Sequence, residues 1–128
     1  MSASILKSKN QSKQTARYAD MFAALGTESR LQILRLLLAA HPDGLVVGDI
    51  QSELGIPAST LSHHLERLKG EGLAVVRREG TFLHYSANTT ALEELLGFLY
   101  EECCSRSNAI NPNAVAGMCG PAQKRKAK

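Results

Sequence analysis

A Gly-Ile-Pro segment at residues 55–57 lies between two short stretches of helical periodicity, and this punctuation constrains the fold more than any other feature. Gly55 is typical of the position just after a helix, and Pro57 is typical of a helix start. Two short helices are therefore expected, one over Leu45–Leu54 and one beginning at Ala58. Their length and their short connection have the spacing of a helix-turn-helix.

The second of these helices separates an apolar stripe from a polar face. Leu61, Leu65 and Leu68 recur at helical spacing and are predicted to be buried. His64 lies three residues after Leu61 and borders that stripe, so we expect a packed or phosphate-facing histidine. Adjacent helical residues diverge and no cysteine is near in sequence, which disfavours a metal site at His63 and His64. The other faces carry small polar and charged residues suited to a groove: Ser59, Thr60, Ser62, His63, Glu66 and Arg67.

Two further helices are predicted before this motif. Apolar residues recur at helical spacing from Tyr18 to Leu25, and Gly26 ends that stretch. Thr27 offers an N-cap for a second helix that ends near His41. The buried side of the second helix is predicted to consist of Leu31, Ile33, Leu34, Leu37 and Leu38.

After the motif, two β-rich runs, Leu73–Arg78 and Phe82–Ala87, predict a β-hairpin around Gly80. A last helix is expected over Thr89–Glu102. The fold class is therefore mainly α with a small β-hairpin, and the order of elements is that of a winged helix-turn-helix DNA-binding domain. The hairpin is the wing, where Arg77 and Arg78 supply positive charge for a phosphate or minor-groove contact, or else a solvated surface.

The length of 128 residues fits one domain, predicted here over residues 15–104. Residues 1–14 are expected to be a flexible arm and residues 105–128 a flexible tail with a basic end. No apolar run approaches the roughly 20 residues of a membrane span, and no apolar block follows the basic N-terminus as in a secretory signal. We therefore expect no membrane association and a cytoplasmic protein whose thiols stay reduced. The net charge of +3 does not by itself identify a nucleic-acid binder.

The three cysteines, Cys103, Cys104 and Cys119, all lie in the last quarter of the chain. They are too few for a multi-bridge scaffold and too concentrated for scattered core packing. A trithiolate suits As(III) or Sb(III), whereas zinc would normally take a fourth ligand. Two alternatives stay open: the thiols could pack as small hydrophobes, or they could form a disulfide in a redox-responsive protein. A thiol oxidoreductase is disfavoured because the chain has no Cys-x-x-Cys and no alternating strand-helix pattern, so we expect no enzyme.

Two segments, read together, carry a family resemblance. The first is Leu-Gly-Thr-Glu-Ser-Arg-Leu-Gln-Ile-Leu at residues 25–34, and the second is Ala-Ser-Thr-Leu-Ser-His-His-Leu-Glu-Arg-Leu at residues 58–68, followed by Gly72-Leu73. Over about Tyr18–Glu102 the chain resembles the ArsR/SmtB family of metal-responsive repressors. The resemblance implies a homodimer that binds a pseudo-palindromic operator in double-stranded DNA, with the polar face of the helix beginning at Ala58 in the major groove.

The departures from the family are informative as well. Many members carry a cysteine pair in the third helix, but Leu45–Ile50 contains none. Zinc sensors of the family need Asp and His on the last helix, but Thr89–Glu102 contains neither. The remaining resemblance is to the arsenic-responsive branch, in which a vicinal Cys-Cys pair and a later Cys bind As(III), although Cys119 lies farther from the pair than is usual there.

The resemblance and the residues together predict two sites and a dimer. The inducer is expected to be As(III) or Sb(III) on Cys103, Cys104 and Cys119, with no organic cofactor. The dimer interface is expected to use apolar residues on the exposed side of the first and last helices: Tyr18, Met21, Phe22, Leu95 and Leu99. The DNA contacts are expected from Ser59, Thr60, Ser62, His63, His64, Arg67, Arg77 and Arg78.

Overall fold

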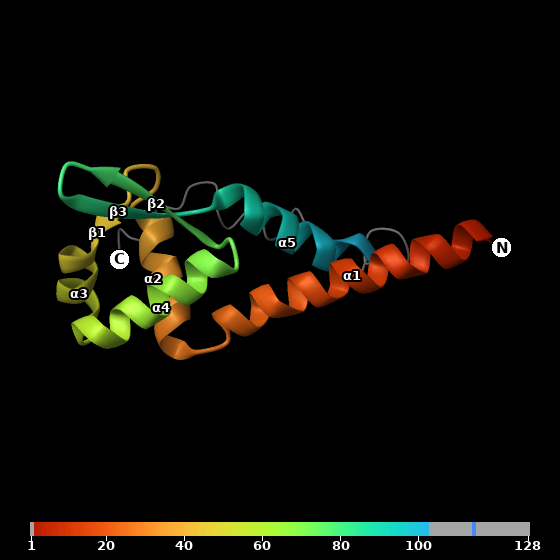
Figure 1. Cartoon of the computed structure of the whole chain (residues 1–128), viewed down its shortest axis with the longest axis horizontal. Helices are drawn as coiled ribbons and strands as arrows, with labels where there is room; N and C mark the ends of the chain where they lie inside the picture. Colours follow the sequence, from red (N-terminus) through yellow and green to blue (C-terminus); the bar gives the residue numbers. More distant parts are fainter. Residues whose placement is uncertain (1, 103–113, 115–128) are drawn as a thin grey trace. The chain divides into compact units, whose positions relative to one another are not determined.

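The computed structural model describes residues 2–102 and residue 114, and it contains the predicted helices and hairpin (Figure 1). A first compact unit ends at Glu93, and the part of α5 from Glu94 onward belongs to a second unit. The elements run in the order α1 (Ser2–Leu25), α2 (Glu28–Ala39), β1 (Leu45–Val46), α3 (Val47–Leu54), α4 (Ala58–Gly70), β2 (Ala74–Glu79), β3 (Phe82–Ala87) and α5 (Thr89–Glu102).

Gly55 and Pro57 end and begin the helices of the helix-turn-helix as the sequence predicts. Gly55 follows α3 in the left-handed conformation, at φ 67°, and its N–H donates to the carbonyl oxygen of Gln51 at 2.8 Å. Pro57 precedes α4, and its carbonyl oxygen accepts the first helical hydrogen bond, from the N–H of Leu61 at 2.8 Å. The two short helices thus meet at a three-residue turn whose backbone is fixed by Gly and Pro.

The core of the first unit lies where the helices meet the sheet. The stripe of α4 is fully buried, and α1, α2, α3 and β2 pack against α4. At about 25 cal/mol for each Å² of apolar surface removed from water, such a cluster is the main source of stability. Its largest fully buried side chains are Met21, Ile33, Leu37, Ile50, Leu61, Leu65, Leu68 and Leu73.

The buried side of α2 is narrower than the sequence prediction. Ile33, Leu34 and Leu37 are buried, but Leu31 and Leu38 are 47% and 41% exposed. Residues seven apart share one face of a helix, and this face lies to one side of the buried stripe. The sequence could not distinguish the buried leucines of α2 from the exposed ones, because leucines occur on both of these faces.

Among the described residues the sheet has three strands, where the sequence predicted two. β2 and β3 form the predicted antiparallel hairpin, and β1 pairs with the other edge of β3, with Leu45 opposite Tyr85 and Val46 opposite His84. The prediction of a helix from Leu45 was therefore wrong by two residues. Leu-Val at this position is extended because β3 offers an unpaired strand edge, a tertiary partner that local sequence does not reveal.

Gly44 explains how the chain reaches that edge. Its φ of 81° favours glycine, and a Cβ there would lie 2.5 Å from the carbonyl oxygen of Tyr85. Only a residue without a side chain lets the backbone approach β3 so closely.

Residues 2–14 belong to the helix α1, which begins at Ser2, whereas the sequence predicted a flexible arm there. The first 25 residues contain no Gly or Pro, and Ala, Leu, Lys and Gln are good helix formers. Residues 1–14 have no apolar residues at helical spacing, which led to the expectation of a flexible arm. Such spacing indicates that one face of a helix is buried, and a helix can form without it. The helix predicted around Tyr18–Leu25 is thus the last part of a longer one.

Candidate nucleic-acid interface

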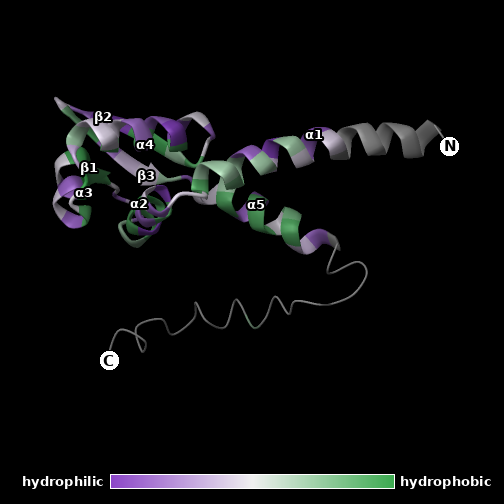
Figure 2. Cartoon of the chain, turned by 90° about the horizontal axis from the view of Figure 1, so that it is seen from below, coloured by the Kyte–Doolittle hydropathy of each residue, from purple (hydrophilic) through white to green (hydrophobic). Residues whose placement is uncertain are grey.

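The polar face of α4 is open to solvent. Ser59, Thr60, Ser62, His63 and Arg67 are all exposed, while the apolar stripe of the same helix is buried. Figure 2 shows the hydrophilic character of α4 as purple along the ribbon. Pro57, the N-cap residue of α4, makes no side-chain cap, and a helix start of this kind leaves backbone N–H groups that can bind an anion such as a phosphate.

His64 differs from its neighbours on α4 because it is half-buried, as the sequence predicts for a residue that borders the stripe. Its Nδ1 lies 3.4 Å from Nη1 of Arg30 on α2. The Nε–H of Arg30 donates to the carbonyl oxygen of Ala24 in the last turn of α1. Burial lowers the pKa of His64, and the positive charges of Arg30 and His63 lower it further, so the neutral imidazole is favoured.

Arg30 was not among the predicted site residues. The sequence offers a signal only in retrospect: Arg30 follows the Thr27 N-cap by three residues, and its backbone N–H donates to Oγ1 of Thr27 at 3.3 Å. This capping position directs the side chain of Arg30 back toward the end of α1. Which residue of α4 it would meet depends on helix packing, and no local pattern reports that.

The wing carries both predicted arginines on its surface. Arg77 and Arg78 are exposed, and Nη2 of Arg77 lies 3.6 Å from Oε1 of Glu79. The same oxygen of Glu79 lies 3.2 Å from Nε2 of His84, the residue paired with Arg77 across the hairpin. Part of the positive charge of Arg77 is therefore offset within the wing, which the sequence reading did not anticipate. Exposed pairs of this kind are typically worth less than about 1 kcal/mol, so a phosphate could compete with Glu79.

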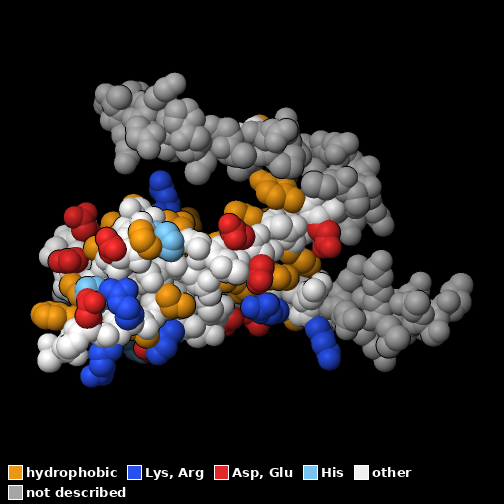
Figure 3. Space-filling view, turned by 90° about the horizontal axis from the view of Figure 1, so that it is seen from above, with side chains coloured by type: hydrophobic (Ala, Val, Ile, Leu, Met, Phe, Trp, Pro, Cys, Tyr) orange, Lys and Arg blue, Asp and Glu red, His pale blue; other side chains and the backbone are white. Residues whose placement is uncertain are grey.

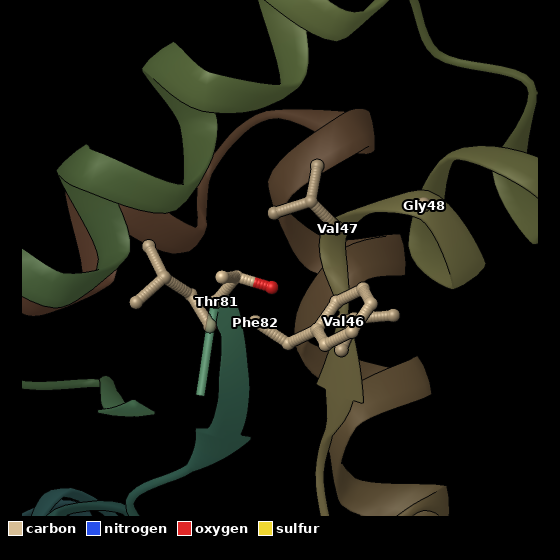
Figure 4. A pocket seen from close by; sticks show the side chains of 6 residues that line it. Val46, Val47, Gly48, Thr81 and Phe82 are labelled. Carbon is tan, nitrogen blue, oxygen red and sulfur yellow. The ribbon is translucent and has the colours of Figure 1, made fainter. Parts of the chain in front are cut away.

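An apolar hollow of about 310 Å³ lies between the start of α3 and the turn of the wing (Figure 4). Phe82 lines it from β3 and is 61% exposed. None of the side chains that line the hollow is a thiol, an imidazole or a carboxylate. Its lining is Val46, Val47, Gly48, Thr81, Phe82 and Leu83.

Basic side chains do not form one continuous field on the face shown in Figure 3. Lys and Arg (blue) are interspersed with Asp and Glu (red) and with apolar side chains (orange). This mixture agrees with the modest net charge of +3. On this face, therefore, charges of one sign do not dominate.

The predicted thiol ligands Cys103, Cys104 and Cys119 lie outside the described residues. Within the described part of the chain, no group of three or more His, Cys, Asp or Glu side chains could hold a metal ion. No helix among the described residues is both long and apolar enough to cross a membrane.

The apolar residues predicted for a dimer interface divide into two groups. Tyr18, Met21 and Leu95 are buried within the chain itself, so they were wrongly expected to be exposed. Phe22 and Leu99 are exposed, as predicted. Leu96 is also exposed, at 48%, and was not predicted; it is the neighbour of the buried Leu95 on α5. Helical spacing identified the apolar faces, but not which of their edges the chain itself covers.

Comparisons with known proteins agree with this geometry. A family model described as a helix-turn-helix domain matches residues 25–77, from the end of α1 into β2. The transcriptional activator HlyU of Vibrio cholerae is 33% identical over 92 residues, which cover 72% of this chain and 82% of that protein. A solved structure of HlyU has a TM-score of 0.58 over 72% of this chain and 97% of its own.

Two further relatives are informative. A homodimeric winged helix-turn-helix DNA-binding domain from Mycobacterium bovis, described as a possible ArsR-family transcriptional regulator, is 32% identical with a TM-score of 0.56, covering 72% of this chain and 85% of its own. A Halobacterium salinarum protein named as a repressor of an arsenical resistance operon, ArsR2, is 33% identical over 70 residues, which cover 55% of this chain and 58% of that protein. With this fold and these relatives, the chain belongs to the ArsR/SmtB family of winged-helix transcriptional regulators, which are DNA-binding proteins and not enzymes.

Proposed function

We propose that the protein is an As(III)-responsive transcriptional repressor. It binds a palindromic operator as a homodimer and leaves the DNA when As(III) or Sb(III) binds the thiolates of Cys103, Cys104 and Cys119. The observation that carries the proposal is that the two kinds of residue lie in separate parts of the chain. The solvent-exposed polar face is on α4, and all three thiols follow the end of α5 in the sequence.

The DNA-binding part rests on α4 and the wing. The small side chains of Ser59, Thr60 and Ser62 allow the helix to enter the major groove, and the longer His63 and Arg67 can reach base edges or phosphates. Arg77 and Arg78 on the wing are suited to the flanking phosphates. A two-fold dimer would present two α4 helices about 34 Å apart, one turn of DNA.

The inducer part rests on ligand chemistry. Thiolates select soft ions, and arsenite, As(OH)₃, reacts with three thiols to give a trithiolate and three water molecules. The described residues offer no competing group of ligands for a metal ion. The family's zinc ligands are absent from α5, and the relative ArsR2 is named for an arsenical resistance operon.

Release would follow from the position of the thiols. Phe22, Leu96 and Leu99 are exposed apolar residues on α1 and α5, which suits these helices to the subunit interface. An ion bound directly after α5 would then alter the spacing of the two α4 helices. Coupling of this kind is typically about 1–3 kcal/mol and is reciprocal, so the operator would weaken ion binding by the same factor.

The test uses the reduced full-length protein and a duplex that it selects from a randomised pool. Fluorescence anisotropy of that duplex is followed while arsenite, antimonite, zinc or peroxide is added. Release by arsenite and antimonite, and its loss in Cys103→Ser and Cys104→Ser proteins that still bind the duplex, would support the proposal. Release by peroxide alone would support a redox-responsive repressor, and arsenite release that persists in both variants would exclude the thiol site.

A further inference from the structure

Arg30 joins three elements of the first unit around the half-buried His64. Its Nε–H donates to the carbonyl oxygen of Ala24, one of the carbonyls that the last turn of α1 leaves without a helical partner. Its Nη1 lies 3.4 Å from Nδ1 of His64 on α4. The donors of a guanidinium are fixed in one plane, so a single side chain sets the position of α4 relative to the end of α1.

The chemistry of this contact decides which nitrogen of His64 carries the proton. Arginine has only N–H donors and no acceptor, so the ring nitrogen that faces it, Nδ1, must be the acceptor. In the neutral imidazole the proton is then on Nε2. Burial, Arg30 and His63 all lower the pKa of His64, which agrees with a neutral ring.

His64 lies on the helix that carries the exposed DNA-facing residues, directly after His63 and within one turn of Arg67. It is partly accessible, and Arg30 occupies its Nδ1 side. The ring therefore has one nitrogen left for an external partner, and that nitrogen is a donor.

We propose that Arg30 is a positioning residue for DNA recognition, which holds His64 as its Nε2–H tautomer so that His64 offers a hydrogen-bond donor to an acceptor on the operator. The inference rests on the proposed function. The acceptor is a phosphate oxygen or a base-edge acceptor of the major groove, which is N7 of a purine, O6 of guanine or O4 of thymine.

The tautomer can be measured without DNA. Long-range ¹H–¹⁵N spectra of the full-length protein at neutral pH are expected to show His64 with a protonated Nε2 and an unprotonated Nδ1. The Arg30→Gln protein is expected to show a mixture of both tautomers. The Arg35→Gln protein is the matched control, because Arg35 is an exposed arginine of the same helix, and it should leave the spectrum of His64 unchanged. A wild-type His64 protonated on Nδ1 would overturn the proposal.

The role toward DNA is tested by a double-mutant cycle on the duplex selected by the wild-type protein. His64→Asn, whose amide mimics Nδ1, is expected to lose affinity on the order of tenfold, as for one lost base or phosphate contact. His64→Gln places an amide N–H at about the position of Nε2–H and is expected to retain part of that affinity. Arg30→Gln should weaken binding in the wild-type background but have little further effect in the His64→Gln background, because that donor no longer depends on a tautomer.

The outcomes separate the possible roles of Arg30. An equal loss on Arg30→Gln in both backgrounds would mean that Arg30 acts through folding or through its own charge, and thermal unfolding of each variant distinguishes these. If the wild-type protein selects no duplex, the proposed function fails and the DNA role fails with it, while the tautomer measurement still decides the contact. A change in preferred sequence for His64→Asn would identify a base acceptor, and a reduced salt slope alone would identify a phosphate.

Discussion

The side-chain amide of Asn88 donates to the carbonyl oxygen of Gly72 at 2.8 Å, a sequence separation of 16 that spans the whole wing. The same side chain accepts the N–H of Ala91 at 3.2 Å and thereby caps the first turn of α5. The backbone N–H of Asn88 adds a bond to the carbonyl oxygen of Leu73 at 2.9 Å. One residue thus ties the start of α5 to the chain that leaves α4.

Asn88→Ala should lower the free energy of unfolding by about 1–2 kcal/mol, because it removes the cap of α5 and leaves the Gly72 carbonyl unpaired. Urea denaturation followed by circular dichroism would measure this. Asn88→Ser is the matched control, since a hydroxyl can still accept from Ala91 but does not reach Gly72. Its loss should be smaller than that of the alanine variant, and equal losses would show that the Gly72 bond contributes the whole effect.

The exposed face of α4 gives a prediction for DNA binding. Ser62→Ala, His63→Ala and Arg67→Ala should each weaken binding to the selected duplex, by about 1–3 kcal/mol for a base contact and with a flatter salt dependence for a phosphate contact. Sedimentation should show that the oligomeric state is unchanged. Ser52→Ala and Arg35→Ala, exposed residues of α3 and α2, serve as controls. Wild-type affinity in all three α4 variants would show that these residues of α4 do not contact the DNA.

Cys119 gives a prediction that separates inorganic from organic arsenic. With only Cys103 and Cys104, As(III) keeps one labile oxygen ligand, whereas a phenyl arsenical already holds one carbon and needs just two thiols. Cys119→Ser should therefore weaken release by arsenite far more than release by phenylarsine oxide. Dose-response curves of duplex release would compare the two. Equal loss with both compounds would show that Cys119 is not the third ligand.

His64 gives a prediction for the dependence of stability on pH. In the unfolded chain its pKa is near the ordinary 6.5, and in the folded chain burial, Arg30 and His63 lower it. Between the lowered value and 6.5 the unfolded state binds more protons, so the contribution of His64 to stability is complete above this window and is lost as the pH falls through it. Wild-type protein should lose more free energy of unfolding than His64→Gln as the pH drops from about 7 to 5. His41→Gln, at an exposed histidine outside α4, is the control, and a parallel loss in wild-type and His64→Gln protein would contradict the assignment.

Much of the fold could be predicted from the sequence because its signals are local. The bounds of α5 and of β3 match the prediction, since Gly80 and the helical stripe of α5 fix them. The strand β1, the hollow beside Phe82 and the Arg30–His64 contact could not be predicted. Each depends on which elements meet in space, and Leu45-Val46 or Arg30 would behave differently beside another partner. The exposed residues of α4 could be predicted from the helical spacing of its leucines.

The junction between β1 and α3 has a mechanical consequence. Val46 ends the strand and Val47 begins the helix, with no residue between them, and the strand is hydrogen-bonded to β3 of the wing. The first helix of the helix-turn-helix and the wing are therefore joined without an intervening loop, which couples their movements. In the proposed dimeric repressor, two such units would set the distance between the operator halves, so a change in the number of base pairs between those halves is expected to weaken binding.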